Sequence, residues 1–117
     1  MKNQWIVPDI HGHLKTLKFL IEDRIALSKS DSIYFLGDYI DRGPDSKGVI
    51  DFIMNLQNSG YDVHCIRGNH EDYCIRAWES DQNCFLFRSK IEKDWRKNGA
   101  LRTLQSFGVK RPSCFVM

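Results

Sequence analysis

The feature that most constrains this chain is a repeated alternation of short apolar runs with amphipathic helical patterns. Each run is too short for a helix and has the length of a buried strand; the runs cover residues 4–7, 32–36 and 61–66. Apolar residues at helical spacing follow each run, over about 13–27, from Val49 to near Gly60, and over about 71–79. This alternation predicts a βαβαβ unit with parallel strands and right-handed crossovers.

The remaining third of the sequence is predicted to be mostly helical. Apolar residues recur at helical spacing over about 90–107, with Gly99 expected to divide the region into two segments. Residues 81–90 are ambiguous, and the tail from Gly108 shows no clear pattern. Strands that are apolar along their whole length predict a sheet buried on both faces. We therefore expect an α/β fold with flanking helices and a single domain over residues 1–117.

Composition excludes several classes of protein. The net charge is only +2, without a run of five like charges, so nucleic acid is not an expected partner. No window approaches the roughly 18 apolar residues needed to span a bilayer, and the first residues lack a secretory signal pattern. The four cysteines show no C-x-x-C spacing, which favours free thiols. We expect a cytoplasmic protein without a membrane partner.

Polar residues gather directly after each predicted strand. The three segments read D-I-H-G-H at 9–13, G-D-Y-I-D-R-G at 37–43 and R-G-N-H-E at 67–71. In open parallel sheets, ligands bind at the carboxyl ends of the strands, so these segments are expected to meet in one site. Their Asp, His and Asn side chains offer oxygen and imidazole nitrogen without thiolate. Such donors suit manganese, iron or magnesium in an open site better than zinc in a closed tetrahedral one.

Three motifs resemble a known family in both order and spacing. D-x-H-G at 9–12, G-D-x-x-D-R-G at 37–43 and G-N-H-E at 68–71 are similar to the motifs of the metallophosphoesterases, and within them to the calcineurin-like phosphoprotein phosphatases. The stretch D-R-G-P-D-S at 41–46, and Trp95 through Asn98-Gly99 to Thr103-Leu104, resemble the small bacterial and phage-type serine/threonine phosphatases. The resemblance covers about residues 4–108 and implies the N-terminal half of an αββα sandwich.

The resemblance also implies a set of metal ligands. Asp9 and His11 would bind a first metal, Asp38 would bridge two metals, and Asn69 would bind the second metal and contact substrate. The implied cofactors are two divalent ions, manganese with iron or magnesium as alternatives. Two such ions lower the pKa of a bridging water from about 15.7 to the neutral range, giving a hydroxide that attacks phosphorus without a phosphoenzyme.

Three further residues receive catalytic roles from the same resemblance. His70 would be the general acid that protonates the leaving oxygen, and Asp41 would orient it in its charged form. A positioned imidazolium contributes about 10² to 10⁴-fold to such a step. Arg42 would bind the phosphoryl oxygens, which its planar guanidinium matches.

The sequence departs from the family pattern after position 70. The family completes its second metal site with two further histidines, whereas the four histidines here are at 11, 13, 64 and 70. The second site would keep only Asp38 and Asn69. One interpretation is the N-terminal part of a phosphatase, whose uncovered apolar sheet face predicts self-association or a partner. Another is a reduced phosphoesterase with one tightly bound metal and a weakly bound second one, which another subunit could complete.

A third interpretation belongs to a different class of protein. The chain would be a non-catalytic metal- or phosphate-binding module that regulates or associates with a full-length relative. If the chain is an enzyme, the family implies phosphoserine or phosphothreonine in proteins as substrate, with dinucleoside polyphosphates as the alternative. The D-R-G-P-D-S form at 41–46 favours the protein phosphatases.

Overall fold

A small parallel sheet forms the first half of the molecule. The computed structural model describes residues 2–83 and 87–115. Its strands are β1 (Gln4–Val7), β2 (Ser32–Phe35) and β3 (Asp62–Cys65), in the order β1-β2-β3 with both pairs parallel. Each strand lies within a run predicted from the sequence, so the α/β class and the parallel pairing are confirmed.

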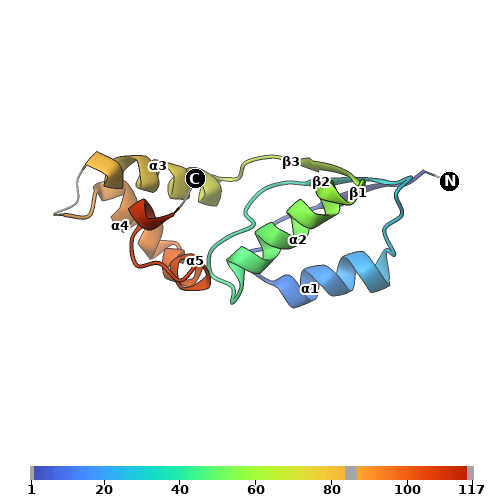
Figure 1. Cartoon of the computed structure of the whole chain (residues 1–117), viewed down its shortest axis with the longest axis horizontal. Helices are drawn as coiled ribbons and strands as arrows, with labels where there is room; N and C mark the ends of the chain where they lie inside the picture. Colours follow the sequence, from blue (N-terminus) through green and yellow to red (C-terminus); the bar gives the residue numbers. More distant parts are fainter. Residues whose placement is uncertain (1, 84–86, 116–117) are drawn as a thin grey trace.

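Two helical segments pack on one side of this sheet. Helix α1 (Leu14–Lys18) continues as a π-helix, η1 (Phe19–Arg24), and α2 is Ser46–Asn58 (Figure 1). The Asp45 side chain caps α2 by accepting the Gly48 N–H at 2.8 Å. The core between sheet and helices is aliphatic and aromatic, and its buried members include Val7, Leu17, Ile21, Ile33, Phe35, Val49 and Ile53.

The first helical region is shorter than predicted. The helical pattern was expected over about 13–27, but η1 ends at Arg24. Ala26 adopts a positive φ of 47°, a conformation that ends a helix and that residue spacing alone does not reveal.

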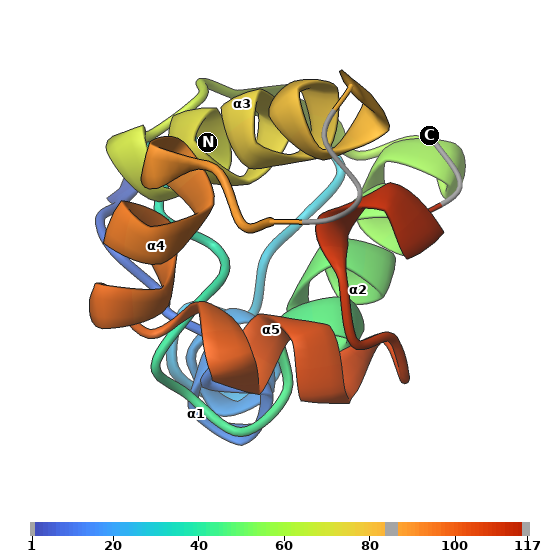
Figure 2. The ribbon, with the colours of Figure 1, turned by 90° about the vertical axis from the view of Figure 1, so that its left-hand side faces the viewer.

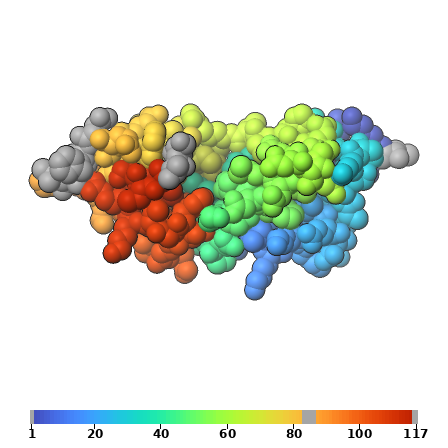
Figure 3. Space-filling model, in the orientation of Figure 1, coloured from blue at the N-terminus to red at the C-terminus, as the bar shows by residue number. Residues whose placement is uncertain are grey.

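The second half of the molecule is a helical cluster beyond the carboxyl ends of the strands. It contains α3 (Asn69–Asn83), α4 (Lys90–Lys97), α5 (Ala100–Ser106) and a 3₁₀ turn, η2 (Pro112–Cys114). Figure 2 is viewed from that end, and there α3, α4 and α5 lie nearest the viewer, in front of the sheet. The molecule is elongated, 55 × 21 × 20 Å, as the space-filling view in Figure 3 shows.

The division of the last helical region at Gly99 is confirmed, because Gly99 lies between α4 and α5 with φ of 100°. Helix α3 was expected over about 71–79, but it begins two residues earlier and extends to Asn83. The ambiguous residues 81–83 are therefore helical. Residues 84–86 of that region lie outside the described residues.

One face of the sheet is uncovered, as expected for the N-terminal part of a phosphatase that lacks the second sheet, although the apolar strands alone predicted burial on both faces. Ile6 is 67% exposed, Leu36 44% and Ile66 58%, and the strand alternation places them with Tyr34 and His64 on one side. We call these five residues the open face. Helices α1 and α2 cover the opposite side, and the other helices extend past the strand ends (Figure 1). An apolar run reports a preference for burial and does not report whether a covering layer exists.

Within the part of the chain that the structure describes, no helix combines the length and apolar character required to cross a bilayer.

Candidate active site

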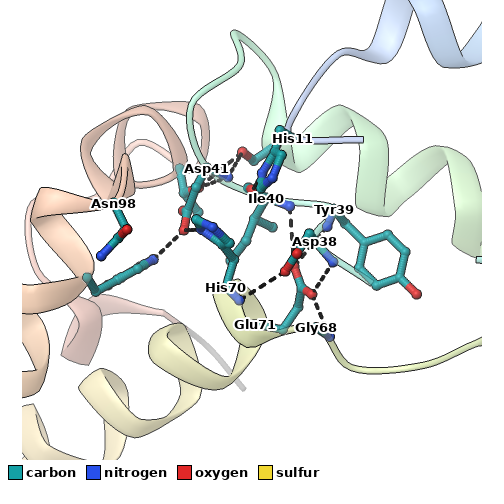
Figure 4. A network of polar contacts seen from close by, with 12 residues as sticks. His11, Asp38, Tyr39, Ile40, Asp41, Gly68, His70, Glu71 and Asn98 are labelled. Atoms are coloured by element: carbon teal, nitrogen blue, oxygen red, sulfur yellow. Dashed lines mark hydrogen bonds and ion pairs between the residues drawn. The ribbon is translucent and has the colours of Figure 1, made fainter. Parts of the chain in front are cut away.

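The three predicted loops meet at the carboxyl ends of the strands. His11, Asp38 and His70 each offer one metal-ligating atom, and these atoms all lie within 4.8 Å of one another. The two imidazole rings meet edge to face, with centroids 4.6 Å apart. Figure 4 shows these residues grouped where the strand ends face helix α3. The sequence motifs therefore form one spatial cluster, as parallel strands require.

The backbone of this cluster is strained. Residues outside glycine rarely adopt positive φ, yet four predicted site residues do so: His11 (45°), Asp38 (55°), Asp41 (74°) and Arg42 (69°). Ala26 is the other such residue in the described part of the chain. Conformations of this kind cost about 1–3 kcal/mol each and persist where surrounding contacts enforce them, typically at functional sites.

His11 is oriented for ligation through one nitrogen. Its Nδ1–H donates to the Ile40 carbonyl at 2.8 Å, which leaves Nε2 as the atom available to a cation. Nε2 lies 3.6 Å from the Asp9 carboxylate. Asp9 therefore neighbours His11 as predicted, but its side chain is 60% exposed and lies outside the tight cluster of His11, Asp38 and His70.

The Asp38 carboxylate lies at the centre of the predicted metal ligands. Its Oδ1 accepts the His70 backbone N–H at 3.0 Å. The Asn69 side-chain amide lies 3.1 and 3.0 Å from the two Asp38 oxygens. With a cation between the two groups, the amide oxygen would face the carboxylate; without one, the amide nitrogen would donate to it. A Cβ at Gly68 would collide with the Asp38 carboxylate, so the close approach of these two loops requires glycine there.

Glu71 joins the second and third loops, a role that sequence reasoning missed. One carboxylate oxygen accepts the backbone N–H groups of Asp38 at 2.6 Å and Gly68 at 2.9 Å. The other accepts those of Tyr39 at 2.9 Å and Ile40 at 3.3 Å. Charge-assisted hydrogen bonds of this kind are among the stronger ones. They hold the strained backbone around Asp38, and the only sequence signal was the position of Glu71 at the end of G-N-H-E.

His70 and Asp41 form a buried pair. His70 Nδ1 donates to Asp41 Oδ2 at 2.8 Å, and the side chains are 5% and 0% exposed. Trp95 and Thr103, on α4 and α5, also donate to the Asp41 carboxylate, each at 2.6 Å. Sequence reasoning quoted both residues for their resemblance but gave them no place in the site. With Nδ1 engaged, His70 Nε2 is the nitrogen available to chemistry.

Arg42 follows this pair on the same loop. Its backbone N–H donates to the Gly99 carbonyl at 3.2 Å, and its side chain is exposed. Arg42 is thus held by its backbone next to the buried Asp41, while its guanidinium remains accessible to a ligand.

The donor set fits a divalent cation. His11 Nε2, the Asp38 carboxylate and the Asn69 amide provide nitrogen and oxygen ligands, with Asp9 beside them. The hydrogen bonds from His11 Nδ1–H to a carbonyl and from the His70 N–H to Asp38 orient these ligands as outer-shell partners do at metal sites. For a second cation, the predicted ligands remain Asp38 and Asn69.

A thiol near the site is unsuited to act as a nucleophile. Burial, together with the smaller effect of the nearby carboxylates of Asp41 and Glu71, raises the pKa of the Cys74 thiol to about 12. Cys74 therefore stays protonated at neutral pH. Among the described residues Cys65, Cys74 and Cys114 are free thiols, as the sequence favoured.

Comparison with known proteins gives a family match that spans all three motifs. The profile of the calcineurin-like phosphoesterases matches residues 3–112. A zinc-dependent endopolyphosphatase of Saccharomyces cerevisiae is 36% identical over 78 residues, covering 66% of this chain and 23% of the relative. Serine/threonine-protein phosphatase 2 of Escherichia coli is 35% identical over 83 residues, covering 70% of this chain and 36% of the relative. This chain thus spans about a quarter to a third of these relatives.

A solved structure gives the corresponding likeness in three dimensions. The crystal structure of a protein assigned provisionally as a diadenosine tetraphosphatase superposes with a TM-score of 0.53 at 25% identity. The superposition covers 80% of this chain and 41% of that protein.

Proposed function

The chain belongs to the calcineurin-like phosphoesterase family, and from that premise we propose that it is a metal-dependent hydrolase of phosphate esters, with phosphoserine or phosphothreonine of proteins as its substrate. The observation that carries the proposal is the convergence of His11, Asp38 and His70 at the strand ends, on a backbone strained at the same residues. Strain maintained at ligating positions is what a preorganised site requires.

The residues divide into metal ligands and groups that act on the phosphate ester. The ligands that would hold the divalent ions are Asp9, His11, Asp38 and Asn69. Manganese is the expected ion. Such ions supply Lewis acidity toward the phosphoryl group and toward water. Arg42 binds phosphoryl oxygens through its exposed guanidinium, with Asn69 beside it. His70 donates a proton from Nε2 to the leaving oxygen, while Asp41 fixes its Nδ1.

The similar proteins include enzymes of two substrate classes. The D-R-G-P-D-S stretch at 41–46 and the similarity to a bacterial serine/threonine phosphatase favour phosphoproteins. The likeness to the structure assigned provisionally as a diadenosine tetraphosphatase favours dinucleoside polyphosphates as the second candidate.

A non-catalytic module is the alternative from a different functional class. Only Asp38 and Asn69 are available as predicted ligands of a second ion among the described residues. A chain that binds one ion, or a phosphate, without turnover would associate with or regulate a full-length relative.

Hydrolysis of p-nitrophenyl phosphate by the purified 117-residue chain tests the proposal. The assay compares manganese, magnesium, iron and zinc, with an Asp38→Asn variant purified identically to expose contaminating activity. We expect metal-dependent hydrolysis that the variant lacks. Rates equal to background in both folded proteins would overturn the proposed function and favour the non-catalytic module. A phosphoserine peptide and diadenosine tetraphosphate, assayed in parallel, separate the two substrate classes.

The open face supports the self-association expected from the sequence, which we propose as pairing of two copies. A two-fold axis would place these five residues opposite the same five residues of a second copy. The cytoplasmic location stays a prediction from the sequence.

A further inference from the structure

The Asp41 carboxylate is held by side chains from three helices. Its Oδ2 accepts His70 Nδ1–H of α3 at 2.8 Å and Trp95 Nε1–H of α4 at 2.6 Å. Its Oδ1 accepts the Thr103 hydroxyl of α5 at 2.6 Å. Asp41 and Trp95 are fully buried and Thr103 is 1% exposed. Figure 4 shows Asp41 extending toward the helical cluster and meeting His70 there.

Helix α5 and Gly99, which precedes it, also bind the backbone of the second loop. Thr103 Oγ1 accepts the Asp41 N–H at 2.8 Å, and the Gly99 carbonyl accepts the Arg42 N–H at 3.2 Å. Asp41 and Arg42 are two of the residues with positive φ. Such a conformation persists only where contacts enforce it. Thr103 of α5 and the Gly99 carbonyl before α5 contribute to holding this loop, and so does the Ser46 hydroxyl, which also accepts the Asp41 N–H at 3.1 Å.

The sharing of one oxygen sets the direction of the His70 ring. Oδ2 receives both the imidazole and the indole, and Oδ1 is fixed by Thr103, so the carboxylate cannot rotate without breaking a buried hydrogen bond. The orientation of an imidazole follows the hydrogen bond made by its other nitrogen. Trp95 and Thr103 thereby determine where His70 Nε2 points.

We propose that Trp95 and Thr103 are positioning residues that act through Asp41 to hold the His70 ring in one orientation, with its Nδ1–H directed at Asp41. The helices α4 and α5 are then part of the working site, although neither supplies a group that touches substrate. The consequence for turnover rests on the proposed phosphoesterase function, whereas the consequence for the His70 ring does not.

Nuclear magnetic resonance of the His70 ring nitrogens tests the proposal without any activity. The full chain is compared with Trp95→Phe and Thr103→Val at one fixed pH, and a His70→Asn variant assigns the signals. We expect the wild type to show one ordered ring whose Nδ1 carries a proton hydrogen-bonded to Asp41, and both variants to show altered nitrogen shifts from a less ordered ring. Thr103→Ser, which restores the hydroxyl, should recover the shifts lost in Thr103→Val.

Trp78→Phe is the matched control for the loss of an indole. Trp78 lies on α3, and within the described residues its Nε1 has no hydrogen-bond partner. The same substitution there should leave the His70 signals in place. Unchanged His70 shifts in both Trp95→Phe and Thr103→Val would overturn the proposal, as would an equal disturbance in Trp78→Phe.

Two phosphate esters extend the test to turnover. Phenolate is a poorer leaving group than p-nitrophenolate, so phenyl phosphate depends more on a positioned general acid. We expect Trp95→Phe to lose on the order of 10-fold in kcat on phenyl phosphate, part of the 10² to 10⁴-fold that such an acid contributes, and to lose less on p-nitrophenyl phosphate. An equal loss on both esters would contradict a role through His70. If the wild type hydrolyses neither ester, the proposed function fails, while the ring-nitrogen comparison still decides the positioning.

Discussion

At the scale of single residues, the site separates groups that bind a cation from groups that handle a proton. The Asp38 carboxylate faces His11, Asn69 and the His70 backbone, with no side-chain cation among these neighbours. His70 instead has its Nδ1 committed to Asp41. A half-buried carboxylate beside imidazole and amide ligands is stabilised by a bound cation, whereas a histidine held through one nitrogen is suited to transfer a proton at the other.

Asp38→Asn and His70→Asn should therefore fail in different ways. Asp38→Asn removes the charge at the centre of the ligands, so manganese affinity should fall by more than the roughly 10- to 100-fold that loss of an outer-shell partner costs. His70→Asn should retain most of the affinity and lower kcat by about 10² to 10⁴-fold. Titration calorimetry with manganese and steady-state kinetics measure the two effects. Equal loss of bound metal in both variants would make His70 a ligand and reject its role as general acid.

Sequence reasoning found the residues that carry chemistry and missed those that hold them. His11, Asp38, Asn69 and His70 were identified because each motif places them in a loop after a strand, and loops after parallel strands converge. Glu71, Trp95 and Thr103 act through hydrogen bonds to a backbone or to a buried carboxylate. Such contacts join residues 33 to 62 positions apart in the chain, and a local pattern contains no information about packing at that distance.

At the scale of elements, the spacing of apolar residues predicted which segments are strands and which are helices well, and predicted where they begin and end less well. The strands and the break at Gly99 were predictable, since apolar runs and a glycine between two amphipathic segments are local signals. The end of the first helical region at Arg24 depends on the positive φ of Ala26. Alanine favours helix, so the sequence does not predict this conformation. The start of α3 at Asn69 places the candidate ligand on the first helical residue, where the sequence had suggested a loop.

Gly99 is where the helical cluster meets the second loop, and its replacement should be costly. Gly99 has φ of 100°, and a Cβ there would lie 2.7 Å from Arg42 Cγ and 2.9 Å from the Arg42 backbone nitrogen. Gly99→Ala should lower the free energy of unfolding by about 2–4 kcal/mol, combining a strained backbone with overpacking. Urea denaturation measures the change.

Gly108→Ala is the matched control for this substitution. Gly108 also has positive φ, 69°, but a Cβ there would meet nothing within 4 Å. Its replacement should cost only the backbone strain of about 1–2 kcal/mol. Equal losses at both positions would mean that the contact between Gly99 and Arg42 does not constrain the loop.

A second connection between elements depends on pH. The Asp31 carboxylate accepts the backbone N–H groups of Asn3 at 3.0 Å and Ser28 at 3.1 Å, and the Trp5 indole at 3.3 Å. These hydrogen bonds lower the pKa of Asp31, and the bond from the Asn3 N–H has the largest effect. Because the folded-state pKa lies below that of the unfolded chain, about 3.9, the stabilisation is present above that pH and is lost as the pH falls through the folded-state value.

Asp31→Asn should therefore be less stable than the wild type at neutral pH, with a difference that shrinks in acid. Urea unfolding at about pH 7 and about pH 3 measures it. Asp23→Asn, at an exposed position of η1, is the control for removing a carboxylate. A difference between wild type and Asp31→Asn that is the same at both pH values would show that the Asp31 charge does not join β1 to the turn before β2.

At the scale of the whole molecule, the two halves have unequal surfaces. The helical cluster buries Trp95, Ala100 and Leu104 and supports the site, whereas the sheet leaves Ile6, Leu36 and Ile66 exposed. Apolar side chains that are contiguous on one sheet face mark an interaction surface, while scattered ones do not. Leu36 and Ile66 directly precede the second and third loops in the chain, so this surface adjoins the candidate site.

Pairing of two open faces predicts a dimer that charge on that face would break. Full burial of one aliphatic side chain contributes about 1.5–3 kcal/mol, so Ile6→Lys with Ile66→Lys should weaken association by more than about 10-fold. Sedimentation velocity over a range of concentrations measures this. Leu101→Lys on α5, where an exposed leucine lies away from the sheet, should leave the dimer intact. A wild-type chain that sediments as a monomer at every concentration would reject self-association, and dissociation by Leu101→Lys alone would move the interface to the helical cluster.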